Sequence, residues 1–88
     1  MAERDVMRYS PSGIPIVAAK LTHQSDQTEA GISRRVEFEM SALAAGQIAQ
    51  QLEQEKLGSE FRFSGFLARK NRNSRSLIFH LTAIVNIE

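Results

Sequence analysis

The sequence predicts a mainly β protein that folds as a single domain over residues 1–88. Two observations lead to this prediction. Apolar and polar residues alternate along several short segments, which is the periodicity of half-buried strands, and only one segment is rich in helix-forming residues. The apolar content of 42% is sufficient for a folded core. Because a chain of 88 residues buries only a small core, we expect oligomerisation to contribute to its stability.

A proline–glycine turn precedes the first well-defined strand. Within SPSG, residues 10–13, Pro11 presets φ at the second turn position and Gly13 accepts a positive φ. Residues 14–23 then read as a strand, and residues 24–31, which are polar and end in glycine, are expected to form a mobile loop. The predicted strand places three apolar side chains on one face: Val17, Ala19 and Leu21.

A second strand and a short helix are predicted in the middle of the chain. Residues 34–40 alternate between apolar and charged side chains, as in a half-buried antiparallel strand. Residues 41–57 change character and contain many good helix formers, so a short helix is predicted near Gln47 to Glu55. Gly58 is expected to end it. The side chains of the strand that are predicted to point inward are Val36, Phe38 and Met40.

Two further strands are predicted in the C-terminal third. In the strand at residues 60–68, Gly65 breaks the apolar alternation and predicts a bulge or a sharp bend. The last strand covers residues 76–87, and its second face, which includes His80, is apolar enough to pack on another subunit. One face of the last strand is predicted to hold Leu77, Phe79, Leu81, Ala83, Val85 and Ile87. We expect four phenylalanines to lie in the core: Phe61, Phe63, Phe66 and Phe79.

This order of elements favours a small barrel of the oligonucleotide-binding (OB) type, with about five strands and a short helix between the third and fourth. The first strand is expected to be truncated or atypical, because Val6 and Met7 are the only obvious apolar residues between the initial methionine and Arg8. A barrel that lacks most of a strand leaves backbone edges unpaired.

The residues exclude most catalytic chemistry. The chain has no cysteine, which removes disulfides, thiolate metal sites and cysteine nucleophiles, and which suits a reducing cytoplasm. His23 and His80 lack metal-ligand spacing, and neither a phosphate-binding glycine loop nor a G-x-S-x-G elbow is present. The sequence therefore predicts a protein that is not an enzyme and that uses no metal or cofactor. No apolar run is long enough to cross a bilayer, so no membrane association is expected.

Positive charge is concentrated in one segment, although the net charge is only +1. Four cations separate the last two strands with no carboxylate among them: Arg69, Lys70, Arg72 and Arg75. In an OB barrel this loop projects beside the ligand-binding face. We therefore predict that these four residues bind phosphates of a nucleic acid, supported by Arg8 and Arg34 and with Lys20 and Arg62 as further candidates. Such binding is salt-sensitive and largely independent of sequence. The alternative is a solvated loop whose charge only aids solubility.

Several short motifs resemble one known family. SPSGIP, KLTHQS, QTEAG with an arginine pair shortly after, and LGS followed by SGF are similar to primosomal replication protein N, the PriB family of bacteria, from Arg8 to the end of the chain. The resemblance implies a homodimeric OB barrel that binds single-stranded DNA and helps to reload the replication machinery at stalled forks. It also implies the PriA helicase and the DnaT protein as partners, and no enzymatic activity.

The chain departs from the family pattern at several positions. Arg8 matches a basic DNA-contacting position, but Gln24 falls where the family has a basic residue and Glu37 where it has an aromatic one. The last hairpin loop is slightly shorter, so its cations match as a group. The short segment before Arg8 leads us to expect altered packing or a rearranged oligomer. Two alternatives remain open: a protein-interaction module with weak or lost DNA binding, and an RNA-binding barrel.

Overall fold

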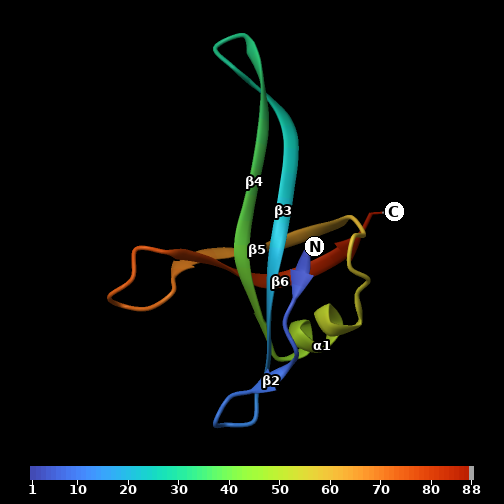
Figure 1. Cartoon of the computed structure of the whole chain (residues 1–88), viewed down its shortest axis with the longest axis vertical. Helices are drawn as coiled ribbons and strands as arrows, with labels where there is room; N and C mark the ends of the chain where they lie inside the picture. Colours follow the sequence, from blue (N-terminus) through green and yellow to red (C-terminus); the bar gives the residue numbers. More distant parts are fainter. Residues whose placement is uncertain (88) are drawn as a thin grey trace.

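The computed structural model describes residues 1–87 and contains six strands and one short helix over that range. The elements are β1 (Glu3–Arg4), β2 (Arg8–Tyr9), β3 (Pro15–Glu29), β4 (Ile32–Ala45), α1 (Gln47–Gln54), β5 (Phe61–Arg69) and β6 (Leu77–Asn86), as Figure 1 shows. The mainly β fold and the short helix before the last two strands are therefore confirmed. No helix among the described residues has the length and apolar content to cross a membrane.

One sheet contains all six strands. Its order is β1-β3-β4-β6-β5, with β2 pairing separately to β3. The pairing is antiparallel throughout except between β4 and β6, which run parallel. The sheet bends into a barrel-like shape but is not closed, because β1 and β5 form its two ends.

The hairpin of β3 and β4 is much longer than the sequence predicted. Its ladder runs from Ile16 opposite Ala45 to Glu29 opposite Ile32, and the hairpin extends along the longest axis of the molecule (Figure 1). The expected loop at residues 24–31 is wrong, because only Ala30 and Gly31, both with positive φ, form the turn. The outer part of β3, at residues 24–29, is polar on both faces, so it carries no apolar alternation that could have revealed it as a strand.

The segment before the proline–glycine turn forms an interrupted strand along β3. Pairs at Glu3 opposite Lys20 and at Arg8 opposite Ile16 define β1 and β2, with Val6 lying exposed between them. At the start of the chain, Met1 is buried and its carbonyl oxygen accepts a 3.1 Å hydrogen bond from the backbone N–H of Gly58. The expected atypical first strand thus takes the form of two short pieces.

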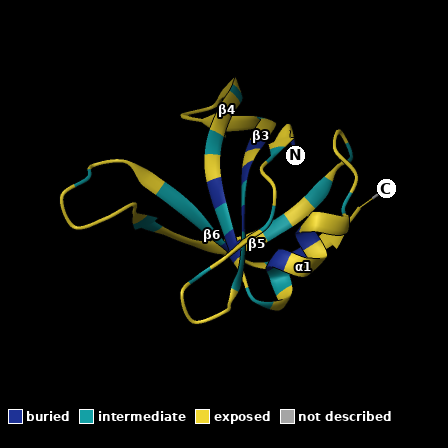
Figure 2. Cartoon of the chain, turned by 60° about the horizontal axis from the view of Figure 1, so that its bottom comes forward, coloured by how far each residue is buried: buried dark blue, intermediate teal, exposed yellow. Residues whose placement is uncertain are grey.

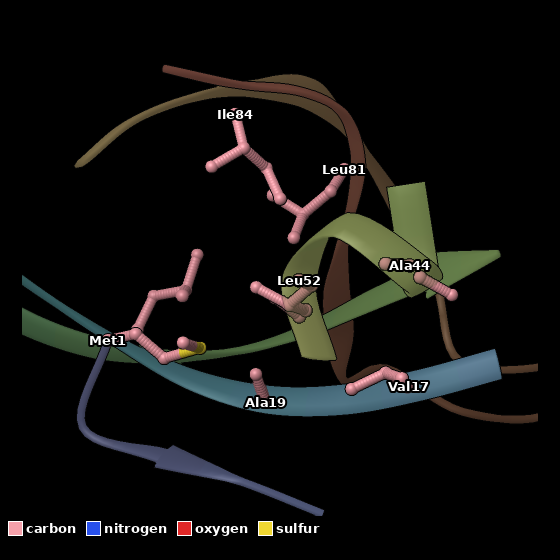
Figure 3. Close-up of a cluster of buried hydrophobic side chains, with 10 residues drawn as sticks. Met1, Val17, Ala19, Ala44, Leu52, Leu81 and Ile84 are labelled. Carbon is pink, nitrogen blue, oxygen red and sulfur yellow. The ribbon is translucent and has the colours of Figure 1, made fainter. Parts of the chain in front are cut away.

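The core lies where α1 packs against the bent sheet. Val17, Ala19 and Leu21 are buried as predicted, and Leu52 of α1 is fully buried beside them (Figure 3). The Arg4 guanidinium donates hydrogen bonds to the carbonyl oxygens of Leu52 and Glu55 and so ties the end of the helix to β1. In Figure 2 the buried residues gather at the base of β3 and β4 and on α1, while the hairpin loops are exposed. The core is therefore small and confined to one end of the long hairpin.

A bulge between β5 and β6 changes which side chains reach the core. Ser64 pairs with Ala83 and Gly65 pairs with Leu81, so Thr82 is an extra residue on β6. The predicted irregularity at Gly65 is confirmed, but the inserted residue lies on the opposite strand. A Cβ at Gly65 would stand 1.9 Å from the His80 carbonyl oxygen, so only glycine permits this close approach.

The bulge also corrects the predicted face of the last strand. Up to Leu81 the odd-numbered residues point inward, but beyond Thr82 the even-numbered Ile84 is buried and Val85 is exposed. One inserted residue reverses which side chains point inward and which point outward along the rest of the strand. The single face predicted from Leu77 to Ile87 is therefore wrong in its second half.

Candidate nucleic-acid interface

A groove lies on the face of β3 and β4 that points away from the core. Because Val17, Ala19 and Leu21 point inward, Lys20 points to the other face, where its ladder partner on β4 is Ser41. The volume of this groove is about 520 Å³. We call it the outer groove, and the residues that line it are Glu3, Asp5, Arg8, Ala18, Ala19, Lys20, Ser41, Ala42, Leu43, Lys70, Ser76, Leu77 and Ile78.

Three cations from separate segments meet at the outer groove. Arg8 comes from β2, Lys20 from β3, and Lys70 from the start of the β5–β6 loop. Glu3 and Asp5 also line the groove, so its own side chains are only weakly cationic. Lys20 lies 3.7 Å from Glu39 in an exposed ion pair, and such a pair is weak enough to exchange for a phosphate contact.

The β5–β6 loop adds cations beside this groove and has a defined backbone. The N–H of Lys70 donates to the carbonyl oxygen of Ser76 at 3.0 Å, which closes the loop. The Asn71 side-chain oxygen accepts the N–H of Asn73 at 3.0 Å, and the Ser74 hydroxyl accepts the N–H of Ser76. The polar residues of this loop therefore hold its backbone turns. Within residues 1–87, Arg69, Lys70, Arg72 and Arg75 are exposed and form no ion pair.

Of the six residues predicted to bind nucleic acid, one lies far from the other five in the structure. Arg34 lies near the tip of the β3–β4 hairpin, where its guanidinium is 3.4 Å from the Glu29 carboxylate. Figure 1 shows this tip at the far end of the long hairpin, well separated from the β5–β6 loop. Of the predicted contacts, Arg8 and Lys70 line the outer groove. Arg69 is the last residue of β5, and Arg72 and Arg75 lie in the loop that follows it.

Sequence reasoning misplaced one aromatic residue. Phe66 was expected in the core, but it is 56% exposed and its ring stacks on His80 with centroids 5.0 Å apart. The signal was in the alternation of β5, where Phe61 and Phe63 occupy odd positions and Phe66 an even one. Phe61, Phe63 and Phe79 do pack against the core, as expected.

A second, larger hollow of about 1010 Å³ lies on the inner side of the open sheet. Its lining is mostly apolar, and its charged side chains are Glu60 and Arg62. Phe38, predicted to point inward, does line this inner hollow but remains 46% exposed, because the hairpin extends beyond the core. Its ring lies against His23 with centroids 4.9 Å apart. This hollow offers apolar surface and few groups for an anionic ligand.

Comparison with known proteins places these features in a family. A family model described as "Another single-strand binding protein family" matches residues 1–83. The chain is 45% identical over 74 residues to the replication restart protein PriB of Nitrosomonas europaea, covering 84% of this chain and 68% of that relative. It is 40% identical over 79 residues to PriB of Bordetella pertussis, covering 90% of this chain and 74% of that relative.

Solved structures agree with this assignment. The structure of PriB from Ralstonia solanacearum superposes with a TM-score of 0.90 at 39% identity, covering 99% of this chain and 88% of that one. The single-stranded DNA-binding protein from Thermus aquaticus, in a deletion mutant, gives a TM-score of 0.72 at 22% identity, covering 99% of this chain and 45% of that one. The second likeness concerns the fold alone, and together with the first it confirms the predicted OB-type architecture.

Proposed function

Because this chain belongs to the PriB family of replication restart proteins, which has the fold of single-strand binding proteins, we propose that it binds single-stranded DNA in the outer groove and along the β5–β6 loop. Membership of this family, whose members are DNA-binding replication proteins, also confirms the expectation that the chain is not an enzyme.

One observation carries this proposal: Arg8, Lys20 and Lys70 meet on a single face beside the exposed cations of the β5–β6 loop. In OB folds, oligonucleotides bind across the second and third strands between the first and last loops. Here those strands correspond to β3 and β4, the first loop is the proline–glycine turn next to Arg8, and the last is the β5–β6 loop. The cations therefore lie where the fold receives its ligand.

Phosphate contacts would dominate this binding. Each exposed cation that approaches a phosphate releases condensed counterions, which favours association and makes it depend on salt. The four loop cations have no ion pair to break within the described chain, so they can approach a strand at little cost. Arg34 is excluded from the proposed path because it lies on the other hairpin and is paired to Glu29.

At the level of the cell, we propose that the protein supports replication restart at stalled forks in the bacterial cytoplasm by helping to load the helicase. The family resemblance supplies PriA and DnaT as the candidate partners and a homodimer as the working form. Because the first strand here is interrupted, the dimer is expected to differ in its packing from that of relatives with a continuous first strand. Sedimentation tests this expectation, and a stable monomer would contradict it.

The proposal is tested by replacing the four loop cations Arg69, Lys70, Arg72 and Arg75 with alanine. We expect affinity for a labelled single-stranded oligonucleotide to fall by about 100-fold or more. The slope of log affinity against log salt should decrease in magnitude by about 3, since each phosphate contact to a single strand contributes about 0.7. Fluorescence anisotropy over a range of salt concentrations measures both quantities.

The matched control is Arg34→Ala on the other hairpin, where the guanidinium is already paired to the Glu29 carboxylate. This variant should bind as the parent does. Undiminished binding by the loop variant in dilute buffer would contradict the proposal. Parallel titrations with duplex DNA and RNA test the specificity, and a preference for RNA would favour the alternative ligand.

A second candidate function, a protein-interaction module with weak DNA binding, is favoured by one feature. Glu37 and Glu39 lie on the same face of β4 as Ser41, so they place negative charge beside the outer groove. Leu67 and Leu77 at the β5–β6 hairpin are also exposed and could contact a protein. Negligible binding to all three nucleic acids, together with binding to a helicase partner, would support this function over the first.

A further inference from the structure

Phe66 and His80 form an exposed aromatic pair that phosphate binding alone does not use. Their ring centroids are 5.0 Å apart and their planes differ by only 11°, which is a stacked arrangement. Phenylalanine is among the residues most often buried, yet more than half of Phe66 is accessible. A flat aromatic surface therefore faces water at a defined place on the sheet.

We propose that this pair is a stacking platform for one unpaired nucleobase of the strand held by the outer groove, an inference that rests on the proposed function. Every base has a π-face, so stacking on an aromatic side chain adds affinity without reading sequence. Stacking on His80 uses one face of the Phe66 ring, and the accessible remainder allows a further planar ring to extend the stack.

The pairing register places this platform on the same face as the outer groove. Ala18 lies opposite Leu43, Leu43 lies beside His80, and His80 lies opposite Phe66. Side chains of ladder partners point to the same side of a sheet. These four residues thus form one row across β3, β4, β6 and β5. Because Ala18 and Leu43 line the outer groove, the platform continues its floor toward β5.

The cations that would hold the backbone of the ligand lie close to this row. Lys70, which lines the outer groove, follows Phe66 by four residues along the β5 direction, or about 13 Å at 3.3 Å per residue. An OB fold commonly holds a strand of four or more nucleotides, so one strand can reach both. Lys20 lies two ladder rows from Ala18 and therefore on the same face of β3. Charge complementarity therefore favours a polyanionic strand over an apolar peptide as the occupant.

A single-tryptophan experiment tests the platform directly. The chain contains no tryptophan, so Phe66→Trp introduces the only indole, and its emission can be excited apart from that of the single tyrosine. We expect titration with oligothymidylate to quench this emission in parallel with binding, which is followed independently by anisotropy of a labelled oligonucleotide. The matched control is Phe38→Trp, because Phe38 also lies against a histidine, His23, but in the inner hollow. Its emission should not change.

Two further variants measure the contribution of the platform to affinity. Phe66→Ala and Phe66→Leu should both weaken binding about tenfold, as expected for loss of one stacked base. The salt slope should stay unchanged, since no phosphate contact is removed. Phe66→Leu retains apolar volume, so its loss of affinity cannot be attributed to unfolding if thermal denaturation matches that of the parent.

Several results would overturn the proposal. Binding detected by anisotropy without quenching of the introduced indole would refute the platform while leaving the proposed function intact. Equal quenching in the Phe66→Trp and Phe38→Trp variants would mean that the effect is not specific to this face. Loss of self-association in Phe66→Ala, with DNA affinity unchanged, would assign the pair to an interface between copies of the chain. Absence of any oligonucleotide binding by the parent would remove the proposed function and this inference together.

Discussion

The two long hairpins of this protein both carry arginines but use them differently. On the β3–β4 hairpin, Arg34 is paired to Glu29 and Arg35 to Glu37, at 3.4 and 2.6 Å. On the β5–β6 hairpin, within the described residues, the four cations from Arg69 to Arg75 have no carboxylate partner. The comparison shows that the number of positive charges does not identify a phosphate site. What matters is whether those charges are already neutralised by neighbours on the same sheet.

The hairpins also differ in their backbone geometry. The β3–β4 ladder is regular from Ile16 to a two-residue turn, while the β5–β6 ladder is interrupted by the extra residue Thr82. A bulge bends its strand and increases the local twist. The bend allows β5 and β6 to cross the base of the long hairpin (Figure 1), where Leu81 and Ile84 complete the core. The long hairpin has no comparable role in the core beyond its base.

The largest difference between the hairpins is expected in the loss of stability when a glycine in each is replaced by alanine. At Gly65 an added Cβ would approach the His80 carbonyl oxygen to 1.9 Å, so Gly65→Ala must move one strand away from the other. We expect a loss of about 3 kcal/mol in the free energy of unfolding. Gly31 in the β3–β4 turn has a φ of +78° but no atom within 4 Å of an added Cβ. Gly31→Ala should therefore cost only about 1 kcal/mol, the cost of the left-handed conformation.

Chemical denaturation of both variants, with thermal unfolding as a second measure, tests this prediction. Equal destabilisation by the two substitutions would mean that β5 and β6 can separate at the bulge without cost, and that the bend does not depend on glycine.

An effect of intermediate size is expected at Glu37, where the family resemblance places an aromatic residue. Glu37 lies on the groove face of β4 and holds the Arg35 guanidinium at 2.6 Å. Glu37→Trp should raise affinity for a short oligonucleotide about tenfold, because it adds a ring for base stacking and removes a negative charge. Glu37→Gln removes the charge alone and is the matched control. If the two variants bind equally well in an anisotropy titration, stacking does not contribute at this position.

Sequence periodicity identified the parts of the fold that are buried. Val17, Ala19 and Leu21 showed a clear alternation because one face of β3 packs under α1, and the helix was found at its observed start, Gln47. The outer part of β3, at residues 24–29, was missed because its side chains are polar on both faces, whereas the strand at residues 34–40 was found from its alternation. Backbone hydrogen bonds and a few exposed cross-strand contacts, such as Arg35 with Gln24 at 3.1 Å, hold these strands.

The interface was predictable in its charge but not in its shape. The unneutralised cluster from Arg69 to Arg75 could be recognised because its residues are neighbours in the chain. The convergence of Arg8, Lys20 and Lys70 depends on pairings between distant segments, which no local pattern encodes. The exposure of Phe66 follows from the alternation of β5, but the bulge was predicted at Gly65, whereas the extra residue is Thr82 on the partner strand.

The smallest effect on stability and on DNA affinity is expected from loss of the exposed ion pair at the tip of the β3–β4 hairpin. Glu29→Gln leaves Arg34 without its carboxylate in a pair whose side chains are both more than 60% exposed. Such pairs contribute at most about 1 kcal/mol, so the free energy of unfolding should change little. DNA affinity should rise less than about twofold, because the arginine becomes available but lies far from the outer groove along the hairpin. A rise comparable to that of Glu37→Trp, measured in the same titration, would mean that the strand also follows the long hairpin to its tip. β3 and β4 would then carry a second binding surface, on which an arginine binds DNA only when its carboxylate partner is removed.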